Sequence, residues 1–139
     1  MISYGRQKID KSDIDLVKEV LASDWLTQGP YLERFEDALC KKFGSSFCSA
    51  VNNGTAALHL AAKALDWKKG DVIITSPITF VSTANSILFS GAIPDFVDIN
   101  PNFYTLDVDK LELKLQDYLS KGLKVKAVIA IDYSGQPCD

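Results

Sequence analysis

Short apolar runs alternate with helical stretches along the second half of the chain, and this order restricts the fold more than any other feature. Apolar runs occupy 71–75, 93–99 and 125–131, and segments with helical spacing lie between them at 80–90 and 106–120. Strands that alternate with helices form a parallel sheet, because each helix returns the chain to the start of the next strand. The last run is almost continuously apolar, which is typical of a strand buried on both faces. The sequence therefore predicts an α/β fold with a mostly parallel sheet and covering helices.

The first half of the chain predicts three helices and one further strand. Apolar residues recur at helical spacing over 11–23, 31–43 and 56–65, and the last segment is apolar almost all round, as in a buried helix. Gly44 is expected to end the second helix, because glycine readily adopts the left-handed conformation that terminates helices. The run Phe47–Val51 is predicted to form a strand, so the order from there onward is β-α-β-α-β-α-β.

Composition excludes several classes of protein. The 139 residues suffice for about one domain, and their 47% apolar content excludes intrinsic disorder. A net charge of −3 without a basic cluster argues against binding to nucleic acid. No apolar run approaches the roughly 20 residues that cross a bilayer, and the N-terminus has no apolar signal core. We therefore expect a cytoplasmic protein with neither a membrane nor a nucleic-acid partner.

The cysteines and the single histidine favour structural roles. Cys40, Cys48 and Cys138 show no Cys-x-x-Cys spacing, and a zinc site needs about four well-placed ligands, so no metal is expected. Free cysteine behaves as a small buried apolar residue. His59 lies in an apolar helix and is predicted to be a hydrogen-bonded core residue rather than a catalytic base.

The segment Asn52–His59 leads through a loop of small and polar residues from the predicted strand into the apolar helix. Small residues let a ligand approach the backbone, and free N–H groups at the start of a helix attract anions. The Thr55 hydroxyl adds a donor, so a phosphate group fits this position. Neither a Walker A loop nor a Gly-x-Gly-x-x-Gly fingerprint is present. The alternative is an ordinary capped helix start that binds nothing.

Two further candidate segments follow predicted strands, at the carboxyl ends where open α/β sheets bind their ligands. In Ser76–Asn85, Phe80 offers a flat face for stacking on a planar cofactor. The alternative is a core phenylalanine in the first turn of a helix. Asp132 and Tyr133 lie at another strand end, within possible reach of a substrate, although polar residues are common at such positions.

Four motifs occur in order along the chain: Trp25–Pro30, Asn53–Leu60, Pro77–Asn85 and Gly91–Ile99. Together they resemble the DegT/DnrJ/EryC1/StrS family of pyridoxal-phosphate (PLP) dependent sugar aminotransferases, and the resemblance covers essentially the whole chain. It implies that residues 1–139 form the N-terminal portion of the large, PLP-binding domain of a fold-type I enzyme. It also implies transamination of a nucleotide-linked sugar.

Within the family the chain looks most like the transaminases of pseudaminic acid biosynthesis. These move an amino group from glutamate to C4 of a UDP-linked 4-keto-6-deoxy-N-acetylhexosamine. The finer resemblance rests on Leu26–Gly29, Ala38–Cys40, Ile74–Ile78 and Asp132–Gly135. The alternatives are an aminotransferase for another keto sugar, a dehydratase of the same family in which histidine replaces the lysine, and a non-catalytic binding module of the same fold.

The resemblance also implies roles for individual residues. Thr55 and Ala56 are implied to hold the PLP phosphate, and Phe80 to stack on the pyridine ring. Six residues are implied to contact the nucleotide-sugar: Tyr4, Asp24, Trp25, Leu26, Thr27 and Gly54. The alternative for Trp25 is an anchor between its loop and the core.

The catalytic residues themselves are expected outside the chain. In the family, the Schiff-base lysine and the acidic partner of the pyridine nitrogen lie beyond the motif that matches Asp132–Asp139. No helix follows the last predicted strand to cover it. We therefore expect an N-terminal fragment that is inactive alone and either poorly soluble or partly unfolded, with the rest of the large domain and a small C-terminal domain following it. The complete protein is expected to be a homodimer.

Overall fold

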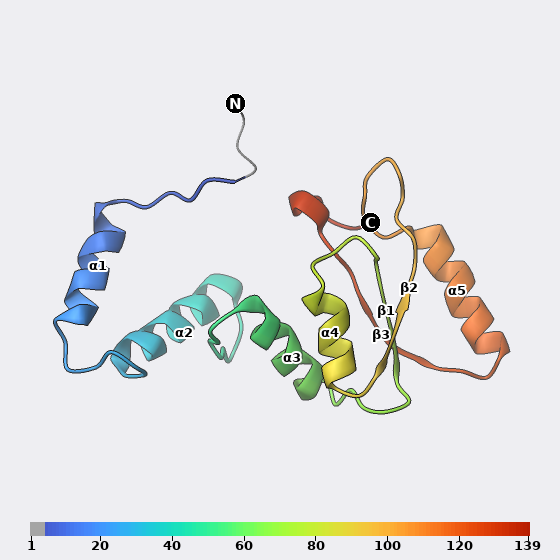
Figure 1. The fold of residues 1–139 in the computed structure, drawn as a ribbon, viewed down its shortest axis with the longest axis horizontal. Coiled ribbons are helices and arrows are strands. Elements are labelled where there is room, and N and C mark those ends of the chain that lie inside the picture. Colours follow the sequence, from blue (N-terminus) through green and yellow to red (C-terminus); the bar gives the residue numbers. More distant parts are fainter. Residues whose placement is uncertain (1–4) are drawn as a thin grey trace. The chain divides into compact units, whose positions relative to one another are not determined.

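The computed structural model describes residues 5–139, which fall into two units, Met1–Ala50 and Val51–Asp139. The first unit contains helices α1 (Lys11–Leu21) and α2 (Pro30–Phe43) (Figure 1). The second unit contains these elements in order: α3 (Gly54–Ala64), β1 (Val72–Thr75), α4 (Ser82–Phe89), β2 (Ile93–Phe96), α5 (Val108–Ser120), β3 (Val125–Ile129) and the short 3₁₀ helix η1 (Tyr133–Gly135). The α/β class predicted from the sequence is confirmed.

Local signals set the ends of the two N-terminal helices. The Asp10 carboxylate accepts hydrogen bonds from the N–H groups of Ser12 and Asp13. The Asp13 carboxylate in turn accepts the Asp10 N–H, which completes a capping box at α1. Helix α2 starts after Gly29, whose φ is 79°. A Cβ on Gly29 would lie 2.8 Å from the Trp25 Cβ, so both backbone and packing require glycine. Gly44, at φ 67°, ends α2 as predicted.

These helices have apolar faces, but no described side chain of the first unit is buried. Apolar residues on both helices remain between 39% and 73% exposed: Leu16, Val17, Leu21, Leu32, Phe35 and Phe43. The unit is therefore held by helix capping and local contacts rather than by a core of its own.

The predicted strand at Phe47–Val51 is absent, and this prediction was wrong. The segment has no regular secondary structure, and Phe47 is 91% exposed. A strand exists only as part of a hydrogen-bonded ladder, and no described strand pairs with this segment. Instead, the Ala50 N–H donates to Glu36 Oε1 on α2 at 2.7 Å. The apolar run thus has strand composition without a strand partner.

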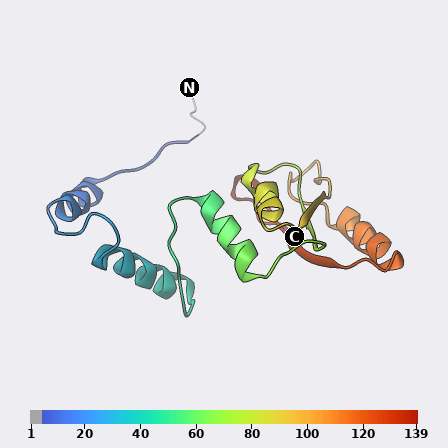
Figure 2. The same ribbon diagram turned by 60° about the horizontal axis from the view of Figure 1, so that its bottom comes forward.

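The second unit is built on a parallel three-stranded sheet in the order β2-β1-β3. Ile73 of β1 aligns with Pro94 of β2 and Ala127 of β3, and the β1–β3 register shifts once between Val72 and Ile73. Helices α4 and α5 lie on opposite sides of the strands in both ribbon views (Figures 1 and 2). The sheet is therefore covered on both faces.

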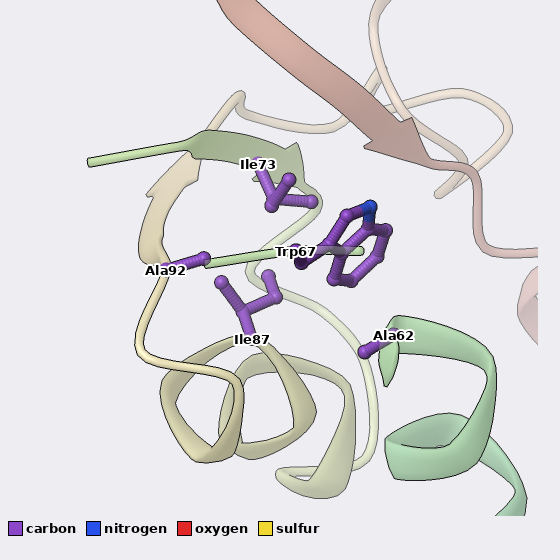
Figure 3. Close-up of a cluster of buried hydrophobic side chains, with 5 residues drawn as sticks. All are labelled: Ala62, Trp67, Ile73, Ile87 and Ala92. Atoms are coloured by element: carbon purple, nitrogen blue, oxygen red, sulfur yellow. The ribbon is translucent and has the colours of Figure 1, made fainter. Parts of the chain in front are cut away.

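Successive residues of β1 supply the cores of the two faces. Ile73 points to the α3–α4 side, where a cluster forms from Ala62, Trp67, Ile73, Ile87 and Ala92 (Figure 3). Ile74 points to the α5 side and packs with Val97 and Leu106. Because β1 is the central strand, all four of its residues are buried.

Two predictions of burial were wrong. The strand at 125–131 was expected to be buried on both faces, but β3 lies at the edge of the sheet and alternates between half-buried and exposed residues. Among the strands of residues 5–139, β1 alone has the two neighbours that a doubly buried strand needs. Helix α3 was expected to be buried, but Ala62 is its one buried residue, and Leu60 is 48% exposed.

A polar clip fixes α5 to β2. Asp95 Oδ2 accepts hydrogen bonds from Lys114 Nζ at 2.7 Å and from the Tyr118 hydroxyl at 2.9 Å. Partial burial alone raises the pKa of Asp95, but the bonds from Lys114, the Phe96 N–H and Tyr118 outweigh burial and hold the pKa below its ordinary 3.8. The same bond to Asp95 raises the pKa of Tyr118.

Among the described residues, no helix has both the length and the apolar character needed to cross a membrane. Residues 5–139 also contain no grouping of His, Cys, Asp or Glu side chains suited to a metal ion.

Candidate cofactor site

The start of α3 and the segment after β1 meet around a hollow of about 700 Å³. The residues that line it are Asn53, Gly54, Thr55, Ala57, Leu58, Phe80 and Ser82. Ligand pockets commonly measure about 300–1,000 Å³, so the hollow has the size of a small-molecule site. It lies where the sequence analysis placed two of its candidate segments.

The start of α3 offers hydrogen-bond donors to the hollow. Asn53 is the N-cap, and its Oδ1 accepts the Ala56 N–H at 2.8 Å. The N–H groups of Gly54 and Thr55 have no acceptor among the described residues. Free N–H groups and the helix dipole together favour an anion at this end. None of the residues lining the hollow in the described chain is ionisable, so the helix start supplies its main positive potential.

Gly54 leaves room for that anion. A Cβ built on Gly54 would meet no atom within 4 Å, and its backbone does not occupy the left-handed region. Neither packing nor conformation within the described chain therefore requires glycine here. The space above the Gly54 Cα belongs to the hollow.

Phe80 supplies an apolar surface on the other side. Its carbonyl accepts the Thr83 N–H at 3.0 Å where α4 begins, and its side chain is 72% exposed. The core alternative for Phe80 is therefore wrong. An exposed aromatic ring beside an open hollow suits a flat ligand that stacks on it.

The structure thus brings together Gly54, Thr55 and Phe80 of the predicted site residues. Ala56 does not line the hollow, and its N–H is occupied by Asn53. Four lining residues lie within the two candidate segments but were given no role of their own: Asn53, Ala57, Leu58 and Ser82. The capping preference of asparagine could have identified Asn53. Ser82, which is 4% exposed, carries no comparable signal.

The predicted sugar-binding residues other than Gly54 belong to the first unit. Asp24, Trp25, Leu26 and Thr27 are exposed in the link between α1 and α2. Trp25, at 59% exposure, packs against Gly29. Tyr4 lies outside the described residues. Their contact with a nucleotide-sugar remains a prediction.

The remaining candidates, which are His59, the cysteines, Asp132 and Tyr133, do not line the hollow. His59 was predicted to be hydrogen-bonded, which was wrong: its Nε2 is buried without a partner among residues 5–139, and its ring meets the Phe89 ring edge-on at 5.5 Å. The three cysteines are free and half-buried. Asp132 Oδ1 accepts the Cys138 N–H at 3.2 Å, and Tyr133 contacts Tyr104.

Comparison with known proteins agrees with this geometry. The pattern that defines the DegT/DnrJ/EryC1/StrS aminotransferase family matches residues 7–139. The chain belongs to this family. Solved relatives include PLP and pyridoxamine-phosphate (PMP) forms, so the family's cofactor is PLP.

Three individual members of the family are similar to this chain. The spore coat polysaccharide biosynthesis protein SpsC of Bacillus subtilis is 41% identical over 99% of this chain and 34% of its own length. A UDP-4-amino-4,6-dideoxy-N-acetyl-beta-L-altrosamine transaminase of Campylobacter jejuni is 38% identical over 97% of this chain and 35% of its own. The structure of Helicobacter pylori PseC, an aminotransferase of pseudoaminic acid biosynthesis, matches with a TM-score of 0.80 and 34% identity, over 99% of this chain and 36% of that one. The chain spans about a third of the length of these family members.

The residues around the hollow fit PLP. The cofactor carries an anionic phosphate and a flat aromatic ring. The free N–H groups of Gly54 and Thr55 and the Thr55 hydroxyl suit the phosphate, and the exposed face of Phe80 suits the ring. The family's cofactor and the chemistry of the hollow therefore agree.

Proposed function

We propose that the complete protein is a PLP-dependent nucleotide-sugar aminotransferase whose cofactor phosphate binds at the start of α3. The observation that carries this proposal is the hollow itself, where a free helix start faces an exposed aromatic ring. An anion site and a stacking surface at one hollow match the two chemical parts of PLP. Family membership supports the same reading.

Each residue has a defined task in this proposal. Gly54 and Thr55 donate their N–H groups to phosphate oxygens, and the Thr55 hydroxyl adds a bond. Ala56 adds its own N–H to the phosphate. Phe80 stacks on the pyridine ring and keeps water from one face of it. When bound, PLP supplies an electron sink that lets an amino group pass between two carbonyl compounds.

The reactive lysine and the acidic partner of the ring nitrogen are proposed to come from other parts of the protein. Among the described residues, those that line the hollow include neither a lysine nor a carboxylate. The 139 residues alone should therefore form only part of the cofactor site and transfer no amino group.

We propose glutamate as the amino donor and a UDP-linked 4-keto-6-deoxy-N-acetylhexosamine, aminated at C4 in pseudaminic acid biosynthesis, as the acceptor. Similarity to the Campylobacter jejuni transaminase and to PseC supports this substrate. Asp24 to Thr27, Gly54 and Tyr4 are proposed to contact the nucleotide-sugar. The similarity to SpsC, at 41% identity, favours a second candidate, the same reaction on a keto sugar used for polysaccharide.

The complete protein is further proposed to be a cytoplasmic homodimer. Support for the dimer comes from the resemblance to fold-type I enzymes. Sedimentation of the full-length protein as an active monomer would overturn that part of the proposal.

The reverse reaction tests the function directly. Full-length protein with PLP should convert UDP-4-amino-4,6-dideoxy-N-acetyl-β-L-altrosamine and 2-oxoglutarate into the corresponding UDP-linked 4-keto sugar and glutamate, measured by the glutamate formed. A UDP-linked 3-amino sugar is the matched control and should give none. Glutamate formed only from the 3-amino sugar would contradict amination at C4, and glutamate from neither would contradict the proposed substrate.

A further inference from the structure

The side chain of Asn53 occupies one of the N–H donors at the start of α3. It caps α3 through the bond from the Ala56 N–H to its Oδ1, at 2.8 Å. Asn53 also lines the hollow, together with Gly54 and Thr55. The Asn53 side chain therefore accepts one N–H of the helix start and also borders the space that we assign to the phosphate.

The donors at this helix start differ in availability. The N–H groups of Gly54 and Thr55 have no acceptor among the described residues, whereas that of Ala56 is already bonded. The Ala57 N–H bonds the Asn53 carbonyl at 3.1 Å and belongs to the helix ladder. A phosphate can reach two N–H groups without any change, but a third only if the Asn53 side chain lets go of Ala56.

An N–H group donates one strong hydrogen bond, so the amide oxygen of Asn53 and a phosphate oxygen compete for Ala56. A bond to a charged acceptor is about twice as strong as one between neutral groups. The phosphate therefore wins this competition once it is bound through Gly54 and Thr55.

We infer that Asn53 is a placeholder: its side chain caps α3 in the cofactor-free protein and is displaced from the Ala56 N–H by the cofactor phosphate. This inference rests on the proposed PLP site. The cap keeps the helix start ordered before the cofactor arrives, and its release completes a set of three N–H donors around the phosphate. Asn53 is thus a positioning residue that acts through the helix start.

Removing the competitor should strengthen phosphate binding. In Asn53→Gly the side-chain cap is gone, while glycine is tolerated at an N-cap at small cost to the helix. We expect the cofactor-free, full-length variant to bind PLP two- to tenfold more tightly than the parent, and inorganic phosphate likewise, as ligand titrations measure. Asn53→Asp retains an acceptor for Ala56 but adds a charge that repels phosphate, and should bind at least tenfold more weakly. Asn52→Gly is the matched control, because Asn52 does not line the hollow, and should bind like the parent.

Three outcomes distinguish a failure of the placeholder role from a failure of the proposed PLP function. Weaker binding by Asn53→Gly would mean that the asparagine amide itself holds the phosphate, and unchanged binding would mean that no displacement occurs. Either result overturns the placeholder role and leaves the PLP site in place. Failure of the parent to bind PLP would instead overturn the proposed function.

A structure of the parent protein with PLP bound tests the displacement without any variant. The Ala56 N–H should point to a phosphate oxygen, and Asn53 Oδ1 should lie beyond hydrogen-bond distance of Ala56. An intact Asn53–Ala56 bond beside a bound phosphate would overturn the inference.

Discussion

The two units of the chain contain similar elements but differ in what those elements pack against. Helices α1 and α2 of the first unit are well capped and amphipathic, yet no described side chain there is buried. In the second unit, shorter elements such as the four-residue strand β1 are completely buried. Good helix signals and a packed core are therefore separate properties.

The difference in packing between the two units indicates where a binding site can form in this chain. A binding site needs groups held at fixed positions, and the second unit provides them because Ile73 and Ile74 anchor β1 between two layers of helices. The hollow lies between the start of α3 and the segment that follows β1. The predicted sugar-binding loop at Asp24–Thr27 lies in the unit that has no core of its own.

Removing core volume should separate the units most clearly. Ile73 is 0% exposed, so Ile73→Ala should destabilise the second unit by about 2–5 kcal/mol through lost burial and the resulting cavity. Leu16→Ala, at 46% exposure on α1, should cost less than about 1 kcal/mol. Urea unfolding followed by tryptophan fluorescence measures both, because Trp67 reports on the second unit and Trp25 on the first. Equal costs would mean that the first unit has a core after all.

Removing the Thr55 hydroxyl should weaken PLP binding by about 1.5–3 kcal/mol, which is roughly 10- to 100-fold. The reason is the loss of one hydrogen bond to a charged phosphate in Thr55→Val. Thr27→Val in the first unit is the control and should leave PLP affinity unchanged. Titration of the cofactor-free, full-length variants with PLP measures both affinities. Equal effects of the two variants would mean that the phosphate does not bind at Thr55.

Acid should loosen the clip between α5 and β2 by about 1 kcal/mol, the upper end for partly exposed ion pairs. The pKa of Asp95 lies below 3.8 when folded, so its stabilising contribution is present above pH 3.8 and is lost as the pH falls through the lowered folded value. Asp95→Asn should remove this part of the acid dependence of unfolding. Asp15→Asn, which breaks the exposed Lys11–Asp15 pair of α1, should change it little. Identical pH profiles for parent and Asp95→Asn would show that the clip adds no stability.

An effect of similar size is expected at Phe80. Phe80→Ala removes a stacking surface worth about 0.5–1.5 kcal/mol, hence about three- to tenfold in PLP affinity. Phe43, which is exposed to the same degree at 73% against 72%, is the control in the first unit. PLP retention after desalting of full-length variants compares them. If Phe43→Ala loses as much cofactor as Phe80→Ala, stacking at Phe80 is not the cause.

Sequence patterns predicted the elements that depend on local signals. The helix end at Gly44 follows from capping chemistry, and the strands near 72 and 93 follow from apolar runs between turns. The candidate residues of the hollow were predictable from two separate signals: Gly54 and Thr55 from the free N–H groups at the start of a helix, and Phe80 from its place after the carboxyl end of β1.

The errors concern properties that depend on neighbours. Phe47–Val51 has the composition of a strand, but composition does not supply a ladder partner. The burial of β3 depends on its place at the edge of the sheet, which its own residues do not encode. The lining residue Ser82 likewise depends on how α4 leaves the strand end, which no local motif specifies.

Hydrogen–deuterium exchange of the full-length, cofactor-free protein with and without PLP tests the central claim most directly. The account predicts slower exchange in peptides that cover 53–57 once PLP binds, because the Gly54 and Thr55 amides pass from no acceptor among the described residues to a phosphate acceptor. Unchanged exchange across 53–57 while PLP is bound would contradict it.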